Sequence, residues 1–495
     1  MRKRARGHAG GRRFLISLLA PVAVGVVIGG VSLLGWSQQL ENVTIDWRFR
    51  AREPYDPPAD FRISLVGIGE YSLKRVGRWE EWTRAVHASV LEALKVRPPA
   101  VLAYDFFFSE ESRDPASDEA FVRALEEAPF ELVTGAVADD TRGDAPLFEG
   151  TAIGKTSPIA EVRGDRSGMV RAPDGPVPIP GVAEAAWTGF VNSPPTGVDG
   201  VRRKVPLVVE FGGQVYPSLV LQILLRLEGA RSGDVEVSLG DQIVIRREGA
   251  EARRIPIDEN GFLWVNYRSR SAFEAIDYIK LGEALEASAG GADWPEGMPS
   301  TAGRIVLVGQ MAEGLADFGS TPYSPREPLV FVQAAALNTI LRADYLRIVP
   351  LWQVLLGWLP LVWGTLYFLR NSSVTWSVVV PLFLAAVYVG MACFLFVERS
   401  LQWPLFLPVA GFLIVQGAAL LDRLVLEMRA KSRIRSLFGT YAPPEVVDAM
   451  IESGEDPKLG GQEMEITAFF SDVEAFSTFS EVLGPEPLVR LMNDY

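Results

Sequence analysis

Four stretches of the sequence consist almost entirely of hydrophobic residues, and each is long enough to cross a lipid bilayer as a helix. The first covers residues 14–36 and follows a basic segment, residues 1–13. The other three cover residues 350–369, 374–397 and 401–421 and are separated only by short polar links. Because so little chain separates them, neighbouring helices must run antiparallel. The pattern predicts four transmembrane α-helices.

Both parts of this prediction have an alternative. A basic start followed by a hydrophobic stretch is also typical of a cleaved signal peptide, but residues 14–36 exceed its usual hydrophobic region of about 7–15 residues. The three later stretches would also fit the core of a soluble protein, yet three in succession with almost no polar face favour a membrane. We therefore expect an uncleaved anchor and three further spans.

Basic residues indicate how the chain crosses the membrane. They are concentrated in residues 1–13 and again directly after the last predicted span. The second group consists of Arg423, Arg429, Lys431, Arg433 and Arg435. The positive-inside rule places both groups in the cytoplasm. Residues 37–349 are then expected outside the cytoplasm, in a multi-pass protein of the cell membrane.

The charge balance limits the chemistry of the outer block. The formal net charge is −13, and residues 41–349 alone hold 46 acidic and 33 basic residues. Such an acidic block is unsuited to binding nucleic acid or an anionic membrane surface. The single cysteine, Cys393, and the two histidines, His8 and His87, exclude a disulfide framework and a metal site rich in cysteine or histidine. Any metal ion would be held by oxygen, and His87 is interpreted as a packing residue.

Short hydrophobic runs alternate with stretches of helical periodicity in residues 37–349, which predicts a mixed α/β domain. We expect helices to cover its sheet on at least one face. The predicted strands are residues 63–68, 100–108, 130–137, 205–211, 242–246, 262–267 and 304–308. The predicted helices are residues 82–96, 219–227 and 330–341, and the Pro- and Gly-rich residues 171–181 are expected to form a loop.

Several motifs of this block occur in the order found in the second type of CHASE domain, an extracytoplasmic sensor that precedes cyclases, histidine kinases and other signalling outputs. The matching segments are Leu65 to Ile68, Gly77 to Trp79, Tyr104 to Phe108, Asp199 to Arg203, Tyr216 to Leu219, Ile305 to Gly309, and Asp317 with Thr321 and Pro322. The block therefore resembles this sensor family, and the three spans that follow fit the family's arrangement. Gly69 and Gln333 depart from the acidic residue and the histidine that the family leads us to expect at their positions.

The resemblance makes four residues candidates for a pocket that binds an unidentified extracytoplasmic ligand: Asp105, Asp199, Arg202 and Asp317. Aspartates at such positions also form turns and hydrogen bonds between loops and strands. Taken singly, each of the four residues is better explained by such a structural role.

Hydrophobic residues recur at helical spacing from Leu420 to Phe438, so the last span is expected to continue as an amphipathic helix into a coupling segment, residues 422–458. Two interpretations stay open. Either the helix only leaves the membrane and its arginines fix the topology, or it dimerises and transmits movement from the sensor. The heptad pattern is too short to decide between them.

Residues 459–495 begin with Leu459-Gly460-Gly461 and continue through Phe470-Ser471-Asp472 to Phe476-Ser477. Residues 466–470 are predicted to form a buried strand that carries Asp472 at its end. One helix is expected to start near Phe476 and another at Pro485. This order resembles the start of a class III nucleotidyl cyclase catalytic domain, which has an α+β, ferredoxin-like fold.

In that family the residue that matches Asp472 binds two divalent ions, Mg²⁺ or Mn²⁺, with help from the carbonyl group of the residue that matches Val473. The nucleotide phosphates lie over the next turn, which here contains Ala475, Phe476 and Ser477, with Ala475 in place of a common glycine. Two cations stabilise the charge on the attacking and leaving oxygens, and the helix N-terminus directs backbone amides at the phosphates. The alternative for Asp472 is a helix cap that binds no metal.

Together these features predict a transmembrane sensory cyclase that converts ATP to 3′,5′-cyclic AMP and pyrophosphate, with GTP as the other candidate substrate. The resemblance implies a homodimer, because each cyclase active site is built from two chains. One carboxylate cannot hold two ions, so we expect this polypeptide alone to be inactive and to be part of a longer enzyme or the product of a truncated gene. The alternatives are a non-catalytic membrane sensor with a vestigial cyclase segment, and an anchored binding module.

Overall fold

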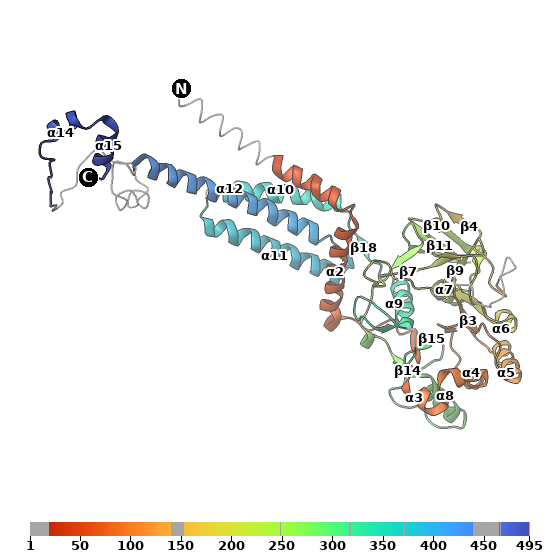
Figure 1. Cartoon of the computed structure of the whole chain (residues 1–495). Coiled ribbons are helices and arrows are strands. Elements are labelled where there is room, and N and C mark those ends of the chain that lie inside the picture. Colours follow the sequence, from red (N-terminus) through yellow and green to blue (C-terminus); the bar gives the residue numbers. More distant parts are fainter. Residues whose placement is uncertain are drawn as a thin grey trace. The chain divides into compact units, whose positions relative to one another are not determined.

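The computed structural model describes residues 19–139, 153–247, 249–315, 318–370, 372–438, 465 and 467–494. The chain divides into two compact units, Met1–Leu420 and Leu421–Tyr495. The larger unit contains a mixed α/β domain and a group of apolar helices (Figure 1).

Six parallel strands form the central sheet of the α/β domain, in the order β14-β1-β15-β2-β3-β6. Their bounds are β1 Ile63–Ile68, β2 Val101–Tyr104, β3 Glu131–Ala136, β6 Trp187–Phe190, β14 Ala275–Asp277 and β15 Ile305–Gln310. Strands β1 and β2 are buried along their whole length, as expected for a parallel sheet that is covered on both faces. All six carboxyl ends therefore lie along one edge of the sheet.

Helices cover both faces of this sheet. On one face lie α4 (Arg84–Leu94), α5 (Pro115–Glu126) and α8 (Tyr278–Ala289), packed against side chains such as Val66 and Leu102. On the other face lie α7 (Leu219–Leu227) and α9 (Leu329–Leu341), packed against side chains such as Leu65 and Val101. Successive strand residues thus enter opposite cores, which is the period of two that extended chains impose.

Smaller elements complete the domain. A four-stranded sheet contains β4 (Glu161–Arg163), β10 (Val235–Ser238), β11 (Gln242–Arg247) and β12 (Ala250–Pro256), and a three-stranded sheet contains β5 (Arg171–Ala172), β8 (Val208–Phe211) and β9 (Gln214–Pro217). Two strand pairs are β7 (Lys204–Pro206) with β13 (Phe262–Trp264), and β16 (Phe318–Gly319) with β17 (Glu327–Pro328). The remaining helices are α3 (Glu70–Val76), α6 (Pro180–Ala185), η1 (Glu53–Tyr55), η2 (Trp79–Glu81), η3 (Ser232–Asp234) and η4 (Arg270–Ala272).

The mixed α/β prediction is confirmed. Each strand or helix predicted in this domain overlaps an element of the same type in the structure. The strand expected at residues 100–108 is too long, because Phe106 and Phe108 leave the sheet and pack in the aromatic cluster around His87. The loop expected at residues 171–181 is wrong at both ends, where β5 and the start of α6 lie.

Three apolar helices follow the domain and are long enough to cross a membrane: α10 (Leu351–Leu369), α11 (Val374–Arg399) and α12 (Phe406–Phe438). The start expected at residue 401 is wrong, because β19 (Leu401–Gln402) pairs with β18 (Arg347–Ile348). Helix α12 runs without a break to Phe438, so the helix predicted from residue 420 to 438 is confirmed.

An apolar helix at Leu19–Val31 packs against α10 and α12 through Ile28, Trp358 and Phe412. The helix end predicted at residue 36 is wrong. The chain turns at residues 32–34, directly before α2 (Gly35–Arg52). The hydroxyl group of Ser37, in α2, donates hydrogen bonds to the carbonyl groups of Val31 and Leu34. Residues 1–18 lie outside the described residues.

The smaller unit contains α14 (Phe476–Val482) and α15 (Pro485–Asp494), at the positions predicted for two helices. The buried strand predicted at residues 466–470 is wrong for residues 467–470, which have no regular structure. Phe469 and Phe470 are 88% and 91% exposed. A strand needs a hydrogen-bonded neighbour, and no strand among the described residues pairs with this segment.

Candidate functional site

Charged residues of helix α2 are buried where that helix meets both the α/β domain and the apolar helices. Figure 1 shows α2 lying across the ends of α11 and α12. We call this region the junction. It consists of Glu41, Asp46, Arg48, Arg52, Asp56, Arg203, Arg268 and Asp344. Buried charges are costly unless they are paired, and several of the pairs here join α2 to another part of the chain.

One ion pair joins α2 to the α/β domain. The guanidinium group of Arg203 donates two hydrogen bonds to the carboxylate of Asp46, at 2.8 and 2.7 Å. It also binds Asp199 at 2.6 Å, and these hydrogen bonds hold the pKa of the Asp199 carboxyl group below its usual value. Arg203 therefore links a loop of the domain to helix α2.

A second group of charges surrounds the end of α2. Arg52 pairs with Asp56 at 2.9 Å and donates to Asn266 Oδ1 at 2.9 Å. Asp56 also accepts hydrogen bonds from Arg268 at 3.2 Å and from the hydroxyl group of Tyr323 at 2.7 Å. The side chains of Arg52 and Asp56 are each only 1% exposed, so this pair depends on its partners in the domain.

The same group reaches the connection between α11 and α12. Arg268 pairs with Asp344, and Asp344 accepts a hydrogen bond from the hydroxyl group of Ser400. Ser400 follows α11 directly and also accepts a hydrogen bond from Asn266 at 3.0 Å. Residues of the α/β domain and of the connection between α11 and α12 are therefore hydrogen-bonded to one another.

Helix α2 also binds the start of α12. Glu41 accepts hydrogen bonds from the backbone amides of Leu405, at 3.1 Å, and Phe406, at 2.9 Å, and pairs with Arg48 at 3.1 Å. Arg48 donates to the carbonyl group of Trp403 at 3.1 Å. A carboxylate at this position satisfies free amides and interacts favourably with the helix dipole. A displacement of α2 would thus act directly on the first turn of α12.

Aromatic contacts add packing to these polar contacts. The ring of Phe49 lies 4.9 Å from that of Phe396 in α11, edge to face, and 6.0 Å from that of Tyr267 in the domain. The guanidinium groups of Arg48 and Arg52 lie 5.4 and 5.3 Å from the ring of Phe396. The junction is therefore a packed unit in which α2 is held on two sides.

The structure places the predicted pocket residues as follows. Asp199 and Arg202 share one loop, where Arg202 donates to the carbonyl group of Ser193 at 2.5 Å. Asp105 is buried at the carboxyl end of β2, two strands from β6 in the sheet. Asp317 lies outside the described residues. Asp199 and Arg202 take part in structural contacts, and a role of any of these residues in binding a ligand stays a prediction.

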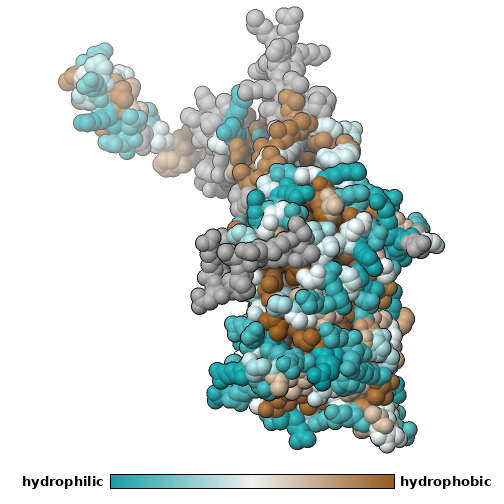
Figure 2. Space-filling model, turned by 90° about the vertical axis from the view of Figure 1, so that its right-hand side faces the viewer, coloured by the Kyte–Doolittle hydropathy of each residue, from teal (hydrophilic) through white to brown (hydrophobic). Residues whose placement is uncertain are grey.

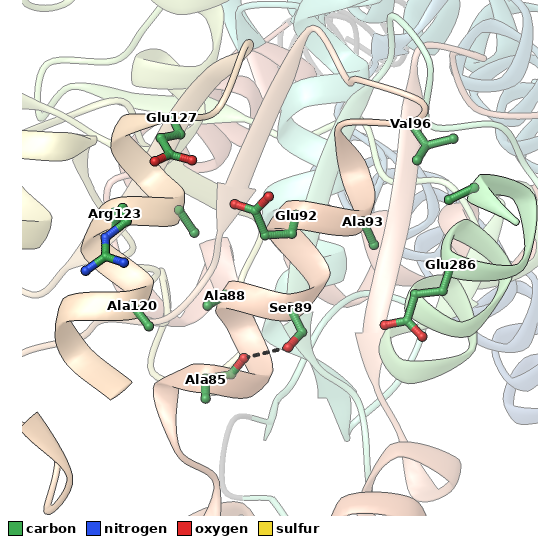
Figure 3. Close-up of a pocket in the computed structure, with 12 residues that line it drawn as sticks. Ala85, Ala88, Ser89, Glu92, Ala93, Val96, Ala120, Arg123, Glu127 and Glu286 are labelled. Carbon is green, nitrogen blue, oxygen red and sulfur yellow. Dashed lines mark hydrogen bonds between the residues drawn. The ribbon is translucent and has the colours of Figure 1, made fainter. Parts of the chain in front are cut away.

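A groove lies elsewhere on the domain, among α4, α5 and α8 (Figure 3). Its volume is about 580 Å³, and small side chains such as Ala85, Ala88 and Ala120 line much of it. Figure 3 shows Glu92, Glu127 and Glu286 around this groove. Lys95 pairs with Glu92 and Glu127, and none of the four predicted pocket residues lines it. The groove therefore belongs to the outer surface of the helix layer.

The residues predicted to bind metal and nucleotide are in the smaller unit. Asp472 is exposed, and the carbonyl group of Val473 accepts a hydrogen bond from the amide of Phe476 at 3.3 Å. Ala475 has φ +56°, in the left-handed region that favours glycine, and lies directly before α14, whose first residues include Ser477. Glycine would adopt this conformation with less strain than alanine.

These residues do not by themselves fit a pair of divalent ions. Mg²⁺ prefers six oxygen ligands, and this turn supplies the carboxylate of Asp472 and the carbonyl group of Val473. No cluster of three or more acidic, histidine or cysteine side chains suited to a metal occurs within the described residues.

The junction was not predicted from the sequence. Among its residues and their partners, only Asp199 and Arg203 lie in one of the CHASE-type motifs. No helix or strand is predicted for residues 37–62. One signal was present: Glu41, Arg48 and Arg52 recur at helical spacing directly after a hydrophobic stretch. Their partners could not be identified, because Asp46 and Arg203 are 157 positions apart.

Comparisons with known proteins agree with the CHASE-type domain that the sequence predicts. A family model, the CHASE2 domain, matches residues 22–379, which is more than two thirds of the chain. A segment of 58 residues is 38% identical to Adenylate cyclase 1 of Rhizobium meliloti (strain 1021) and covers 12% of this chain and 9% of that protein. The match thus spans less than a tenth of the length of the curated relative. No solved structure matches.

Proposed function

Because this chain belongs to the CHASE2 domain family, we propose that it is the sensory and membrane part of a receptor that controls a nucleotidyl cyclase. Its α/β domain lies outside the cytoplasm and binds an unidentified signal, and the helix at residues 19–31 together with α10, α11 and α12 anchors it in the cell membrane. The smaller unit lies inside and begins a cyclase domain that converts ATP to cyclic AMP and pyrophosphate as a homodimer. The partial likeness to an adenylate cyclase supports this output.

The observation that carries the proposal is the junction. Its ion pairs connect the loop of Asp199 to α2 through Arg203 and Asp46, and α2 binds the first turn of α12 through Glu41. Helix α12 then continues without interruption from its apolar part to Phe438. A rearrangement of the domain that moves α2 would therefore move the helix that precedes the proposed catalytic segment.

The test uses the protein encoded by the native reading frame, including any codons that follow that of Tyr495, in membrane vesicles. We expect cyclic AMP from ATP with Mg²⁺ or Mn²⁺, and an assay with GTP tests the other substrate. Asp472→Ala should abolish the product, whereas Glu474→Ala, at a neighbouring exposed carboxylate, should retain it. Formation of cyclic nucleotide that is independent of Asp472 would overturn the proposed role of this residue.

A second candidate is a sensor without catalysis, in which the smaller unit only mediates interactions between chains. Residues 467–470 have no regular structure, although a strand is predicted directly before Asp472, and this favours the second candidate. If the complete reading frame yields no cyclic nucleotide with either substrate or either metal ion, this alternative is supported and the proposed cyclase activity is contradicted.

A further inference from the structure

Helix α2 has an exposed hydrophobic face that no part of the described chain covers. Leu40, Val43 and Trp47 are 38%, 59% and 50% exposed, and Tyr55, just after the helix, is 77% exposed. The opposite faces of α2 are buried in the junction, where Asp46 and Phe49 contact the domain. Spacings of three and four residues place Leu40, Val43 and Trp47 along one side of α2, and Tyr55 follows in η1. We call them the α2 stripe.

The contacts of α2 show where the stripe lies relative to the apolar helices α11 and α12. Glu41 binds the amides of Leu405 and Phe406 at the start of α12, and Phe49 packs on Phe396 near the end of α11. The helix is therefore fixed at the ends of two apolar helices that are long enough to cross a membrane. A bilayer around α11 and α12 must have its boundary with water at the depth of α2.

The surface next to the stripe has the same character. A groove of about 260 Å³ between α2 and α11 is lined by Ala51, Tyr55, Phe394 and Val397, with Arg48 and Glu398 at its polar side. Large exposed hydrophobic side chains are frequent along α11, including Phe383 and Phe394. On the domain face in Figure 2, by contrast, hydrophobic residues form separate patches among hydrophilic ones. The stripe therefore extends the hydrophobic surface of α11 as far as the polar junction.

We propose that α2 is a membrane-interface helix whose stripe, Leu40, Val43, Trp47 and Tyr55, is seated in the headgroup region of the outer leaflet. Tryptophan and tyrosine are enriched at this depth because they combine an apolar ring with a polar group. Asp46 and Glu41 lie on the same helix as the stripe. A movement of α2 in the lipid interface would therefore also move the junction. The inference rests on the membrane anchoring proposed above.

A second copy of the chain is the competing occupant, and the size of the stripe argues against it. A stable protein interface buries about 800 Å² on each partner, whereas an aromatic side chain buries about 150–250 Å² in total. Four side chains that are already partly covered by their own chain do not provide such an area. Lipid headgroups and the upper parts of acyl chains require no defined shape.

Spin labels on single cysteines test the inference in vesicles that contain the full chain. With Cys393→Ala as background, nitroxide is attached to Val43→Cys, and its accessibility to oxygen is compared with its accessibility to a water-soluble nickel complex. Val198→Cys is the matched control, because this valine is 84% exposed on the α/β domain. Phe383→Cys, at a residue 65% exposed in α11, reports whether the span is in lipid. All three residues are exposed, so the substitutions leave the core intact.

The expected result is a ratio of oxygen to nickel accessibility at residue 43 that is several-fold higher than at residue 198 and lower than at residue 383. A water-like ratio at residue 43 with a lipid-like ratio at residue 383 would overturn the interface helix alone. A label at residue 43 that neither reagent reaches and that shows dipolar broadening between copies would overturn it in favour of a dimer. A water-like ratio at residue 383 would reject the membrane anchoring itself, and with it the inference.

Discussion

Arg203 binds Asp46 through two parallel hydrogen bonds, although the two residues are 157 positions apart in the chain. The side chain of Arg203 is 2% exposed and that of Asp46 is 10% exposed, so the pair has little access to water. Paired hydrogen bonds between guanidinium and carboxylate groups are directional as well as strong. This pair therefore fixes the orientation of α2 on the domain, in addition to holding it there.

The substitution Asp46→Asn should destabilise the protein by about 3 kcal/mol, because breaking a buried ion pair leaves a charge without full compensation. Asp199 still binds Arg203 and limits the loss. The measurement is thermal unfolding of the full chain in detergent micelles, followed by tryptophan fluorescence. The control is Asp199→Asn: the side chain of Asp199 is 30% exposed, and we expect its loss to cost about 1 kcal/mol or less. Equal effects of the two substitutions would show that burial does not set the strength of these pairs.

Local patterns predicted most of the α/β domain because its elements are short and strongly hydrophobic. Strand β1 and helix α7 have the predicted bounds. Helices α5 and α8 were missed, and a weak hydrophobic pattern is not the reason, because α5 is as amphipathic as α4, which was predicted. Their start signals were nonetheless present: Asp114 precedes Pro115 and accepts from the amide of Ala116, and Asp277 caps α8.

The candidate site could not be predicted in the same way, because its contacts join distant parts of the chain. Arg52 binds Asn266, and Asn266 binds Ser400. A charged residue in a helix is normally exposed, and only the packed structure shows that Arg52 is buried. The strand before Asp472 was wrong for a related reason: Phe469 and Phe470 have a β-favouring sequence, but strand formation depends on a neighbour that local sequence does not specify.

His87 should make the stability of the domain depend on pH. Its ring is buried among aromatic side chains, and Nδ1 lies 3.0 Å from the hydroxyl group of Tyr278. Burial, followed by the nearby charge of Arg84, lowers the pKa of His87 to about 3. Below pH 6.5, its ordinary pKa, the unfolded chain binds a proton that the folded chain does not. The free energy of unfolding should therefore fall by about 1.4 kcal/mol per pH unit between roughly pH 6 and pH 4.

The substitution His87→Gln isolates this effect, because the amide keeps a hydrogen-bonding group near Tyr278 but does not titrate. We expect the variant to be less stable at pH 7.5 and to lose less stability on acidification. Carboxylates that titrate in the same range affect both proteins, so the difference between the two slopes is the quantity to compare in denaturant unfolding from pH 7.5 to pH 4.5. Identical slopes would mean that His87 is protonated in the folded domain.

The first turn of α7 lies so close to β6 that Gly189 has no space for a side chain. A Cβ atom at this position would lie 2.7 Å from Leu219 Cα and 3.0 Å from Leu219 N, and backbone atoms cannot move aside as a flexible side chain does. Gly189→Ala should destabilise the domain by about 1–3 kcal/mol. Gly233→Ala is the control, since nothing lies within 4 Å of its Cβ position, and we expect a change of less than about 0.5 kcal/mol in denaturant unfolding. An alanine at position 189 without cost would contradict this packing of α7.

Glu41 should be the most sensitive single residue of the contact between α2 and α12. Its carboxylate binds the amides of Leu405 and Phe406 and pairs with Arg48, whose side chain is fully buried. In Glu41→Gln the amide group retains an acceptor but loses the charge that compensates Arg48 and the helix dipole, so we expect a loss of about 2–3 kcal/mol in thermal unfolding. Limited proteolysis should also cleave the connection at residues 400–405 faster. Glu53→Gln, an exposed acidic residue just after the same helix, is the control and should change neither measurement. If Glu41→Gln unfolds like the parent protein and its connection is equally resistant, α2 does not hold the first turn of α12, and the proposed path of coupling fails at that contact.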